Sequence, residues 1–169
     1  QKMTKDIDEM EKMLNDYLHF AKTQTHENLS KVDLSSLFYQ IKNDLNNDKL
    51  IIKDLNKLII TGRLHSLKRC FENVIQNGLT YGNKVYVEIQ KGYNIISINI
   101  EDDGPGIPEE HYKNVFKPFF RLDKSRNLNK SGIGLGLAIV EDIINSHGGH
   151  IQLNKSKHNG LQVKISLPI

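Results

Sequence analysis

Apolar residues recur at helical spacing in four stretches of the chain. Over residues 1–28 the spacing alternates between four and three, the heptad pattern of a helix that packs against another helix. Helical periodicity returns over residues 33–45, 63–81 and 137–147, and a Gly-Gly pair comes after the last stretch. We predict four helices. The first needs a partner helix or a second subunit to cover its apolar stripe; the alternative is packing against its own domain. The stripe consists of Met3, Ile7, Met10, Leu14, Tyr17 and Ala21.

Short runs rich in β-branched residues lie between these helices. They occupy residues 50–52, 58–60, 85–89, 95–100, 151–153 and 161–167. We expect the first two runs to pair with each other, the next two to form a hairpin, and the last two to form a hairpin that turns near Asn159-Gly160. Because successive strands connect mostly as hairpins, the pattern favours an α/β sandwich with a mixed sheet over a parallel doubly wound fold.

The composition excludes several classes of protein. The 169 residues are 38% hydrophobic and 25% charged, which suits one compact domain with a short appendage. The net charge of +3 comes without a basic cluster, so we expect no nucleic-acid partner. A single cysteine excludes a disulfide framework. No apolar run reaches the roughly 20 residues that span a bilayer, and the first residue is Gln. We expect a fragment of a longer protein with no membrane contact of its own.

Two amides and a tyrosine share one face of the third predicted helix. Asn73, Asn77 and Tyr81 are spaced by four residues, and amides are poor helix formers. Two stacked amides suit contacts to a ligand or to a metal through oxygen. The alternative is a solvated polar stripe.

Glycine-rich segments lie after one predicted strand and before the last predicted helix. The first segment, directly after the strand at 95–100, reads Asp102-Asp103-Gly104-Pro105-Gly106-Ile107. Its glycines allow a ligand to approach the backbone, and the Asp102 carboxylate would suit a base or an amine better than an anion. The alternative is a simple turn at the strand end. Residues 132–136 read Gly-Ile-Gly-Leu-Gly and enter a helix, a place where free N–H groups bind phosphate. This loop matches neither the dinucleotide fingerprint nor the P-loop.

In this order and spacing, the three segments resemble the N, G1 and G2 boxes of sensor histidine kinases, within the gyrase, Hsp90, histidine kinase and MutL (GHKL) ATPase superfamily. Residues 116–121, Phe-Lys-Pro-Phe-Phe-Arg, resemble the F box, and His147-Gly148-Gly149 fits the family pattern just after the G2 helix. The resemblance covers almost the whole chain and is nearest to the EnvZ-like osmosensor type. It implies a two-layer α/β sandwich (the Bergerat fold) over residues 29–169, which would be the catalytic ATP-binding domain. Residues 1–28 would be the second helix of the dimerisation and histidine-phosphotransfer hairpin.

The resemblance implies a site for ATP and Mg²⁺. Asp102 would bind the adenine amino group, Tyr81 would stack near the base, and Asn77 and Asn73 would ligate Mg²⁺. Residues 122–131 would form the ATP lid, whose cations contact phosphate. The residues implied for the nucleotide site are Asn73, Asn77, Tyr81, Asp102, Gly104, Gly106, Ile107, Phe116, Arg121, Lys130, Gly132, Gly134, Leu135 and Gly136.

The implied activity is ATP-dependent phosphorylation of a histidine on the hairpin of the same, homodimeric protein. The phosphoryl group would then pass to an aspartate on the receiver domain of a response regulator. None of the seven histidines lies in an H-box, so we expect the acceptor outside this chain. The parent would be an inner-membrane sensor of a bacterium, with this domain in the cytoplasm.

Three positions bear on the alternatives. Hydrolysing members of the superfamily carry Glu where Asn73 stands, and an amide is no general base, which argues against a clamp or chaperone ATPase. Thr80 replaces the usual Lys or Arg, which favours a non-catalytic nucleotide sensor as the other alternative. Gly78 stands where the family usually has Ala, at a cost of about 1 kcal/mol in helix propensity.

Overall fold

The computed structural model describes residues 27–53, 55–122 and 134–169, together with Ile7, Glu11, Leu14 and Leu18. These four residues have helical backbone and are exposed, including the three apolar ones, Ile7, Leu14 and Leu18. That they belong to a dimerisation hairpin stays a prediction. In the part of the chain that the model describes, no helix is long and apolar enough to cross a membrane.

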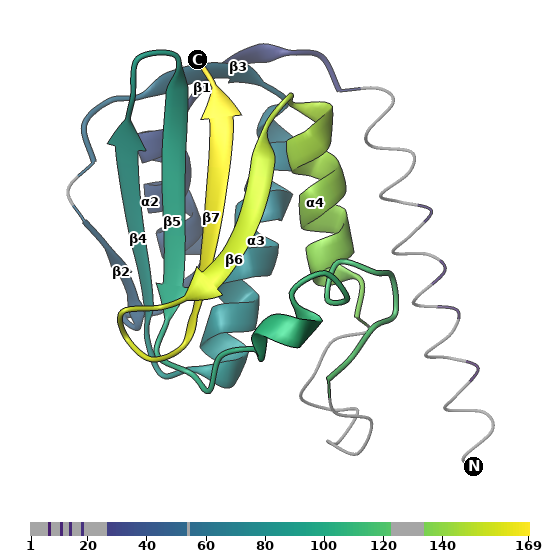
Figure 1. Cartoon of the computed structure of the whole chain (residues 1–169). Helices are drawn as coiled ribbons and strands as arrows, with labels where there is room; N and C mark the ends of the chain where they lie inside the picture. Colours follow the sequence, from purple (N-terminus) through teal and green to yellow (C-terminus); the bar gives the residue numbers. More distant parts are fainter. Residues whose placement is uncertain are drawn as a thin grey trace.

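Five strands form the main sheet, in the order β2-β4-β5-β7-β6 (Figure 1). They are β2 (Leu50–Ile52), β4 (Val85–Lys91), β5 (Ile95–Asp102), β6 (His150–Lys155) and β7 (Leu161–Pro168). The pair β2–β4 is parallel and the other pairs are antiparallel. The predicted hairpins β4–β5 and β6–β7 and the mixed character of the sheet are therefore confirmed.

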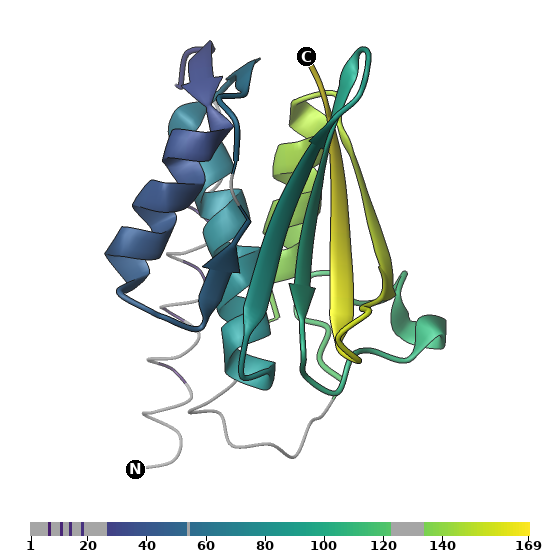
Figure 2. The ribbon, with the colours of Figure 1, turned by 90° about the vertical axis from the view of Figure 1, so that its left-hand side faces the viewer.

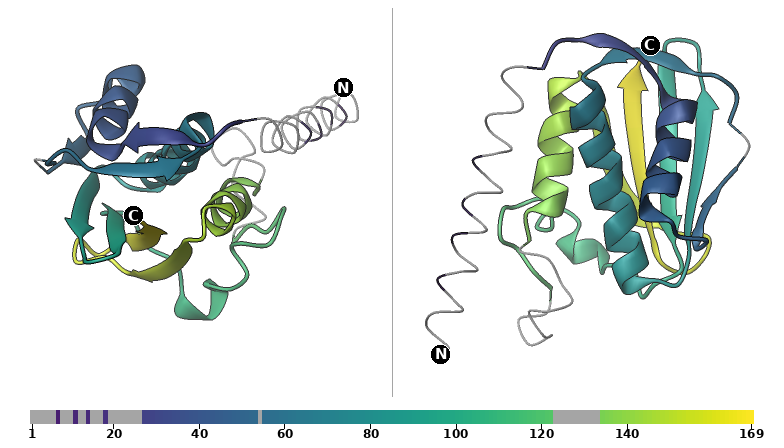
Figure 3. Two further views of the ribbon diagram at one scale, coloured as in Figure 1. Left: turned by 90° about the horizontal axis from the view of Figure 1, so that it is seen from above. Right: turned by 180° about the vertical axis from the view of Figure 1, so that it is seen from behind.

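Three α-helices cover one face of this sheet, and within the described residues no α-helix lies on the other face (Figures 2 and 3). They are α2 (Leu34–Leu45), α3 (Leu64–Tyr81) and α4 (Gly136–Ser146), and they lie side by side in the view from behind (Figure 3). The predicted two-layer α/β sandwich is confirmed.

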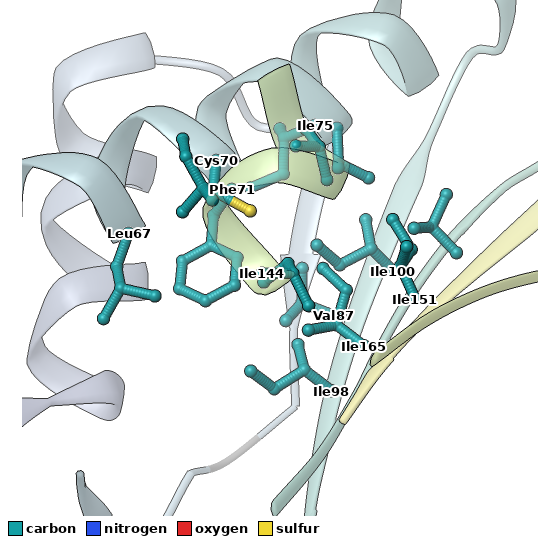
Figure 4. Close-up of a cluster of buried hydrophobic side chains, with 14 of the residues drawn as sticks. Leu67, Cys70, Phe71, Ile75, Val87, Ile98, Ile100, Ile144, Ile151 and Ile165 are labelled. Atoms are coloured by element: carbon teal, nitrogen blue, oxygen red, sulfur yellow. The ribbon is translucent and has the colours of Figure 1, made fainter. Parts of the chain in front are cut away.

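The core fills the space between the two layers. Side chains of α3, among them Phe71 and Ile75, and Ile144 of α4 face Ile98 and Ile165 of the sheet (Figure 4). All five are buried. Because α3 places its apolar residues on one stripe, its opposite positions are free to carry polar groups.

One predicted strand pair is wrong. The run at 50–52 forms β2 and pairs with β4, whereas the next run forms β3 (Ile59–Gly62) and pairs with β1 (Ser30–Asp33) in a separate antiparallel ribbon. The connection from β2 to β3 thus leads from one sheet to another. A parallel partner for β2 requires a crossover, and α3 supplies it.

The helix α3 receives its N-terminal cap from a distant residue. Its own N-cap, Arg63, makes no side-chain hydrogen bond to the helix. The carboxylate of Glu27 instead accepts hydrogen bonds from His65 N (2.6 Å), Ser66 N (3.0 Å) and Ser66 Oγ (2.8 Å). Burial alone would raise the pKa of Glu27, but these bonds outweigh it and the pKa is lowered. Glu27 lies two residues before the domain start predicted at residue 29, and that boundary stays a prediction.

The helix and strand ends that carry the predicted motifs lie together at one end of the molecule. The C-terminal ends of α3 and β5, the turn between β6 and β7, the 3-10 helix η1 (Glu109–His111) and the start of α4 all lie at the lower end in Figure 1.

Candidate functional site

The last turns of α3 meet the start of α4 and the loop after β5. A Cβ atom on Gly136, the first residue of α4, would lie 3.5 Å from Asn77 Nδ2. A Cβ on Gly104 would lie 2.9 Å from the carbonyl oxygen of Tyr81, whose ring is half exposed. The structure therefore brings Asn77 beside the G2 segment and Tyr81 beside the G1 segment.

Asn73 lies one helical turn before Asn77. Its Nδ2 is buried and has no hydrogen-bond partner among the described residues. An unpaired buried amide is costly, so its presence points to a partner supplied by a ligand or by water. Thr80, on the same helix, donates its hydroxyl to the carbonyl of Gln76 at 2.7 Å and carries no charge toward this site.

Asp102, the last residue of β5, is a buried carboxylate with one oxygen fixed. Its Oδ1 accepts hydrogen bonds from Gly104 N at 2.9 Å and from Leu161 N at 3.2 Å. Within residues 27–53, 55–122 and 134–169, no donor reaches Oδ2. Burial raises the pKa of Asp102, the two N–H groups lower it, and the neighbouring Asp103 raises it, with a net increase. The free oxygen is an acceptor held in place at low solvent exposure.

Asp103 has a structural role at the same strand end. Its Oδ1 accepts hydrogen bonds from Lys84 N at 2.8 Å and Asn83 N at 2.6 Å, which close the turn between α3 and β4. The bond from Lys84 lowers the pKa of Asp103. Asp103 is more exposed than Asp102 and its hydrogen bonds fix the turn, whereas the buried Asp102 keeps Oδ2 beside Gly78.

Two glycines allow other elements to approach Asp102. A Cβ on Gly78 of α3 would lie 2.6 Å from Val85 Cγ2 and 3.8 Å from Asp102 Oδ2. A Cβ on Gly160, in the β6–β7 turn, would collide with Oδ1 and the carbonyl oxygen of Asp102. Gly78 therefore meets a steric demand that offsets its low helix propensity.

The F box and the G2 segment are joined by a backbone hydrogen bond. Phe119 N donates to the Gly134 carbonyl at 2.9 Å. Both residues have positive φ, +65° and +82°, and a Cβ on Gly134 would lie 2.8 Å from the Phe120 carbonyl oxygen. Only glycine fits at 134, and the bond holds the segments before and after the predicted lid beside each other.

The remaining predicted residues lie in several different surroundings. Ile107, Phe116 and Leu135 pack against the hydrophobic core and hold the loops that carry them. Gly106 has a φ of +70° and lies against the β6–β7 turn, where a Cβ would be 3.2 Å from the Gly160 carbonyl oxygen. Arg121 is partly buried at the end of the F box. Lys130 and Gly132 lie outside the described residues, as does most of the predicted lid.

Sequence reasoning missed the contribution of the β6–β7 turn. Asn159-Gly160 predicts a hairpin turn, and nothing in the sequence indicates that this turn covers Asp102. It also missed Glu101, whose side chain lies on the other face of β5 and binds the same turn. The contacts join residues more than fifty positions apart, which no local spacing encodes.

The donor set suits a cation that shares its ligands with a bound anion. Among the residues that the model covers, no group of three or more His, Cys, Asp or Glu side chains is placed to hold a metal. Asn77 offers a single amide oxygen beside Gly136. Mg²⁺ takes most of its ligands from water and phosphate, so one or two amide oxygens fit it. No described side chain caps α4, which leaves the N–H groups of its first turn for an anion.

The fold and this constellation define a class of nucleotide-binding domain, and comparison with known families agrees. Residues 62–169 match the family model described as histidine kinase-, DNA gyrase B- and HSP90-like ATPase. The chain belongs to this family, and within it to the ATP-binding domains of sensor histidine kinases. The family resemblance found in the sequence is thereby confirmed.

Similar proteins are sensor histidine kinases. The sensor histidine kinase GtrS of Pseudomonas aeruginosa is 33% identical over 170 residues, which cover 99% of this chain and 35% of GtrS. CpxA of Escherichia coli is 37% identical over 112 residues, which cover 64% of this chain and 24% of CpxA. This chain thus spans about a third or less of these two relatives.

Solved structures show the same fold. The mycobacterial sensor histidine kinase MprB superposes with a TM-score of 0.72 at 25% identity, over 83% of this chain and 97% of MprB. The histidine kinase domain of the E. coli osmosensor EnvZ superposes with a TM-score of 0.62 at 31% identity, over 83% of this chain and 88% of that domain.

Proposed function

We propose that this chain binds Mg-ATP and donates the γ-phosphoryl group to a histidine on a dimerisation hairpin. In that step the bond between the γ-phosphorus and the bridging oxygen breaks, a P–N bond forms, and ADP leaves. A response-regulator aspartate then takes the group from the histidine. The family supports an ATP-binding kinase domain; the metal, the acceptor and the regulator are parts of the proposal.

The observation that carries the proposal is the half-satisfied carboxylate of Asp102. Two backbone N–H groups hold Oδ1, and Oδ2 stays available to a donor beside Gly78. The adenine amino group is such a donor, whereas guanine presents an oxygen at that place and would be repelled. Gly104 and Gly106 let the loop lie close to the base, and the Tyr81 ring is exposed enough to stack on it.

The polyphosphate end of the nucleotide fits the start of α4. Gly136 adds no side chain at the start of α4, and the uncapped first turn of this helix favours an anion. Gly134, fixed by Phe119 N, lies two residues before that turn. Asn77, with Asn73 one turn before it, would hold Mg²⁺ through amide oxygens. Bound there, Mg²⁺ would neutralise phosphate charge. Gly132, Arg121 and Lys130 are proposed to complete the phosphate contacts.

Position 73 argues for transfer rather than hydrolysis. An amide takes no proton from water at neutral pH, so the γ-phosphoryl group survives until an imidazole nitrogen arrives. Thr80 favours a second candidate, a nucleotide sensor without transfer, because its hydroxyl is engaged with Gln76 and supplies no cation.

The first helix is proposed as the link to the partners. Ile7, Leu14 and Leu18 lie on one helical face and are exposed, which suits packing against the histidine-bearing helix in a homodimer. We place the domain on the cytoplasmic side of a membrane-anchored bacterial sensor.

Calorimetric titration with a non-hydrolysable ATP analogue tests the binding site. We expect Asp102→Asn to weaken binding by about 10- to 100-fold, because the amide nitrogen faces the adenine amino group and a hydrogen bond to a charged acceptor is lost. Asp103→Asn, which removes the neighbouring charge but keeps an acceptor for Lys84 and Asn83, serves as the matched control and should bind like wild type. Equal affinity of all three proteins would contradict the adenine site. Omitting Mg²⁺ should weaken binding of wild type and Asp103→Asn alike.

A second assay separates the kinase from the nucleotide sensor. The chain is mixed with a separately produced hairpin that carries an H-box histidine and with ATP labelled on the γ-phosphate. Label on the hairpin supports transfer. Tight Mg-ATP binding without label would favour the sensor.

A further inference from the structure

The turn between β6 and β7, residues 156–160, contacts two neighbouring carboxylates on β5. Successive side chains of a strand point to opposite faces, so Glu101 lies on the open face of the sheet and Asp102 on the helix-covered face. The turn crosses the end of β5 and contacts both carboxylates. This places one rigid element between a residue of the site and a residue outside it.

Glu101 is buried although it faces no ligand. It is 4% exposed, and its Oε2 accepts hydrogen bonds from Ser156 Oγ (2.9 Å) and Lys157 N (3.1 Å). Gln162 Nε2 lies 3.4 Å from Oε1. Burial would raise the pKa of Glu101, but these bonds outweigh it and the pKa is lowered. A buried carboxylate is costly unless it is paired, so these donors fix the turn to β5.

The turn is tied within itself. Ser156 N donates to the Gly160 carbonyl at 2.9 Å, Asn159 N donates to the Ser156 carbonyl at 3.1 Å, and His158 N donates to Ser156 Oγ at 2.9 Å. The ring of His158 stacks on Tyr86 of β4, with 3.8 Å between the ring centroids. A displacement at Ser156 is therefore passed on to Gly160.

At its other end the turn fixes Asp102. Leu161 N donates to Oδ1 of Asp102 at 3.2 Å, and Gly160 packs so closely on this side chain that a Cβ would collide with it. The path from Glu101 to Asp102 thus consists of short contacts that begin at a buried bond, Ser156 Oγ to Glu101, and continue through part-buried ones.

We infer that Glu101 is a positioning residue that orients the adenine acceptor of Asp102 through the β6–β7 turn. The inference rests on the proposed function, in which Asp102 binds the adenine amino group. Glu101 itself lies on the opposite sheet face and touches no nucleotide. Its loss releases Ser156 and Lys157, loosens Gly160 and Leu161, and lets the Asp102 carboxylate rotate.

The test compares ATP with inosine triphosphate, which carries an oxygen in place of the adenine amino group. Wild type should prefer ATP. In Glu101→Met, which has similar length but no acceptor, we expect the ATP-to-inosine-triphosphate affinity ratio to fall by about tenfold, because the acceptor is no longer oriented. Glu101→Gln should restore the ratio, since its amide oxygen still accepts from both Ser156 and Lys157.

Glu88→Met is the matched control. Glu88 lies on the same sheet face and contacts Lys157 Nζ at 3.5 Å and Lys53 Nζ at 2.9 Å, but it does not bind the backbone of the turn. It should keep the wild-type ratio. Amide hydrogen exchange gives a readout without nucleotide: the Leu161 N–H should exchange faster in Glu101→Met and at the wild-type rate in Glu88→Met.

The outcomes separate the inference from the proposed function. Absence of ATP binding by wild type would overturn both. A wild-type preference for ATP that Glu101→Met leaves intact would overturn the inference alone. Should Glu101→Met unfold, Ser156→Ala, which deletes a single hydroxyl, replaces it in the test. A fall in its ATP-to-inosine-triphosphate affinity ratio and faster exchange of the Leu161 N–H would support the inference, and wild-type values of both would overturn it.

Discussion

Three consecutive carboxylates at the end of β5 differ in their surroundings. Hydrogen bonds lower the pKa of Glu101 and of Asp103, whereas burial raises the pKa of Asp102. The outer two hold turns, and the middle one keeps its Oδ2 without a donor among the described residues. Groups whose pKa values are pushed apart by their surroundings often differ in function, so the raised pKa of Asp102 and its hydrogen-bond geometry support its proposed role in binding the ligand.

Asp102→Asn should stabilise the domain in the absence of nucleotide. The folded-state pKa lies above the unfolded value of 3.8, so ionisation opposes folding and stability is lost as pH rises through the folded pKa. Asn still accepts from Gly104 and Leu161 but carries no charge. We expect the Tm of Asp102→Asn at pH 7 to exceed that of wild type, by about 2–4 °C for each kcal/mol of added stability. Below about pH 3, where the wild-type carboxyl group is protonated, the two proteins should have the same Tm. An unchanged or lower Tm at pH 7 would contradict this account.

At this scale the sequence predicted part of the site. The glycine pattern after β5 pointed to a close backbone approach beside Asp102, and the family resemblance supplied the role that stays a prediction for this residue. The pattern was not enough to find Glu101 or Gly160. Their importance depends on which turn lies under β5, and that contact joins segments that are distant along the chain.

Among the elements, α3 depends on a residue outside its own sequence for its cap. Glu27→Ala should destabilise the domain by about 1 kcal/mol, the usual cost of losing an N-cap, because His65 N and Ser66 N lose their acceptor. The lowered pKa of Glu27 means that its contribution is complete above about pH 4.5 and is lost as pH falls through the folded pKa. Urea unfolding at pH 7 and at pH 3 measures both effects.

Glu11→Ala supplies the control for that prediction. Glu11 is an exposed glutamate nearer the N-terminus, and its removal should leave the urea midpoint unchanged at either pH. If Glu27→Ala and Glu11→Ala unfold at the same urea concentration, the cap contributes nothing to stability.

The helices α2, α3 and α4 and the two hairpins were predictable, because their periodicity and turn residues are local. The partners of the short strands were not. Leu50–Ile52 and Ile59–Gly62 are apolar runs without a register signal, and each pairs with a strand that is not its neighbour in the chain. The intervening α3 decides the pairing of β2, and only the packed core fixes where α3 lies.

At the scale of the whole molecule, His147 connects α3 and α4 at the end of the structure that lies away from the site. Arg63 N donates to Nε2 at 3.0 Å, and Nδ1 is 2.7 Å from the Ile143 carbonyl, which it reaches as a donor. Burial lowers the pKa of His147, the bond to Ile143 raises it, Arg63 lowers it, and the net shift is downward. The neutral ring therefore joins the start of α3 to the end of α4.

Global stability should fall as the solution becomes more acidic than the ordinary histidine pKa. Because the folded pKa of His147 is below 6.5, the unfolded chain binds the proton first, and the contribution that is complete above about pH 6.5 is lost below it. Tm should drop as the pH falls below about 6.5 and through the folded pKa. His147→Gln should reduce that drop, and an identical drop in the variant would assign the pH dependence to other groups.

The position of β7 in the sheet has a consequence for biosynthesis. β7 lies between β5 and β6, yet it is the last of the five strands in the chain. Because the ribosome makes the chain from its N-terminus, every glycine-rich motif exists before the strand that completes the sheet. The N–H of Leu161 that fixes Asp102 is made later still than those motifs. Under the proposed function, the nascent chain therefore cannot recognise adenine until translation has passed residue 161.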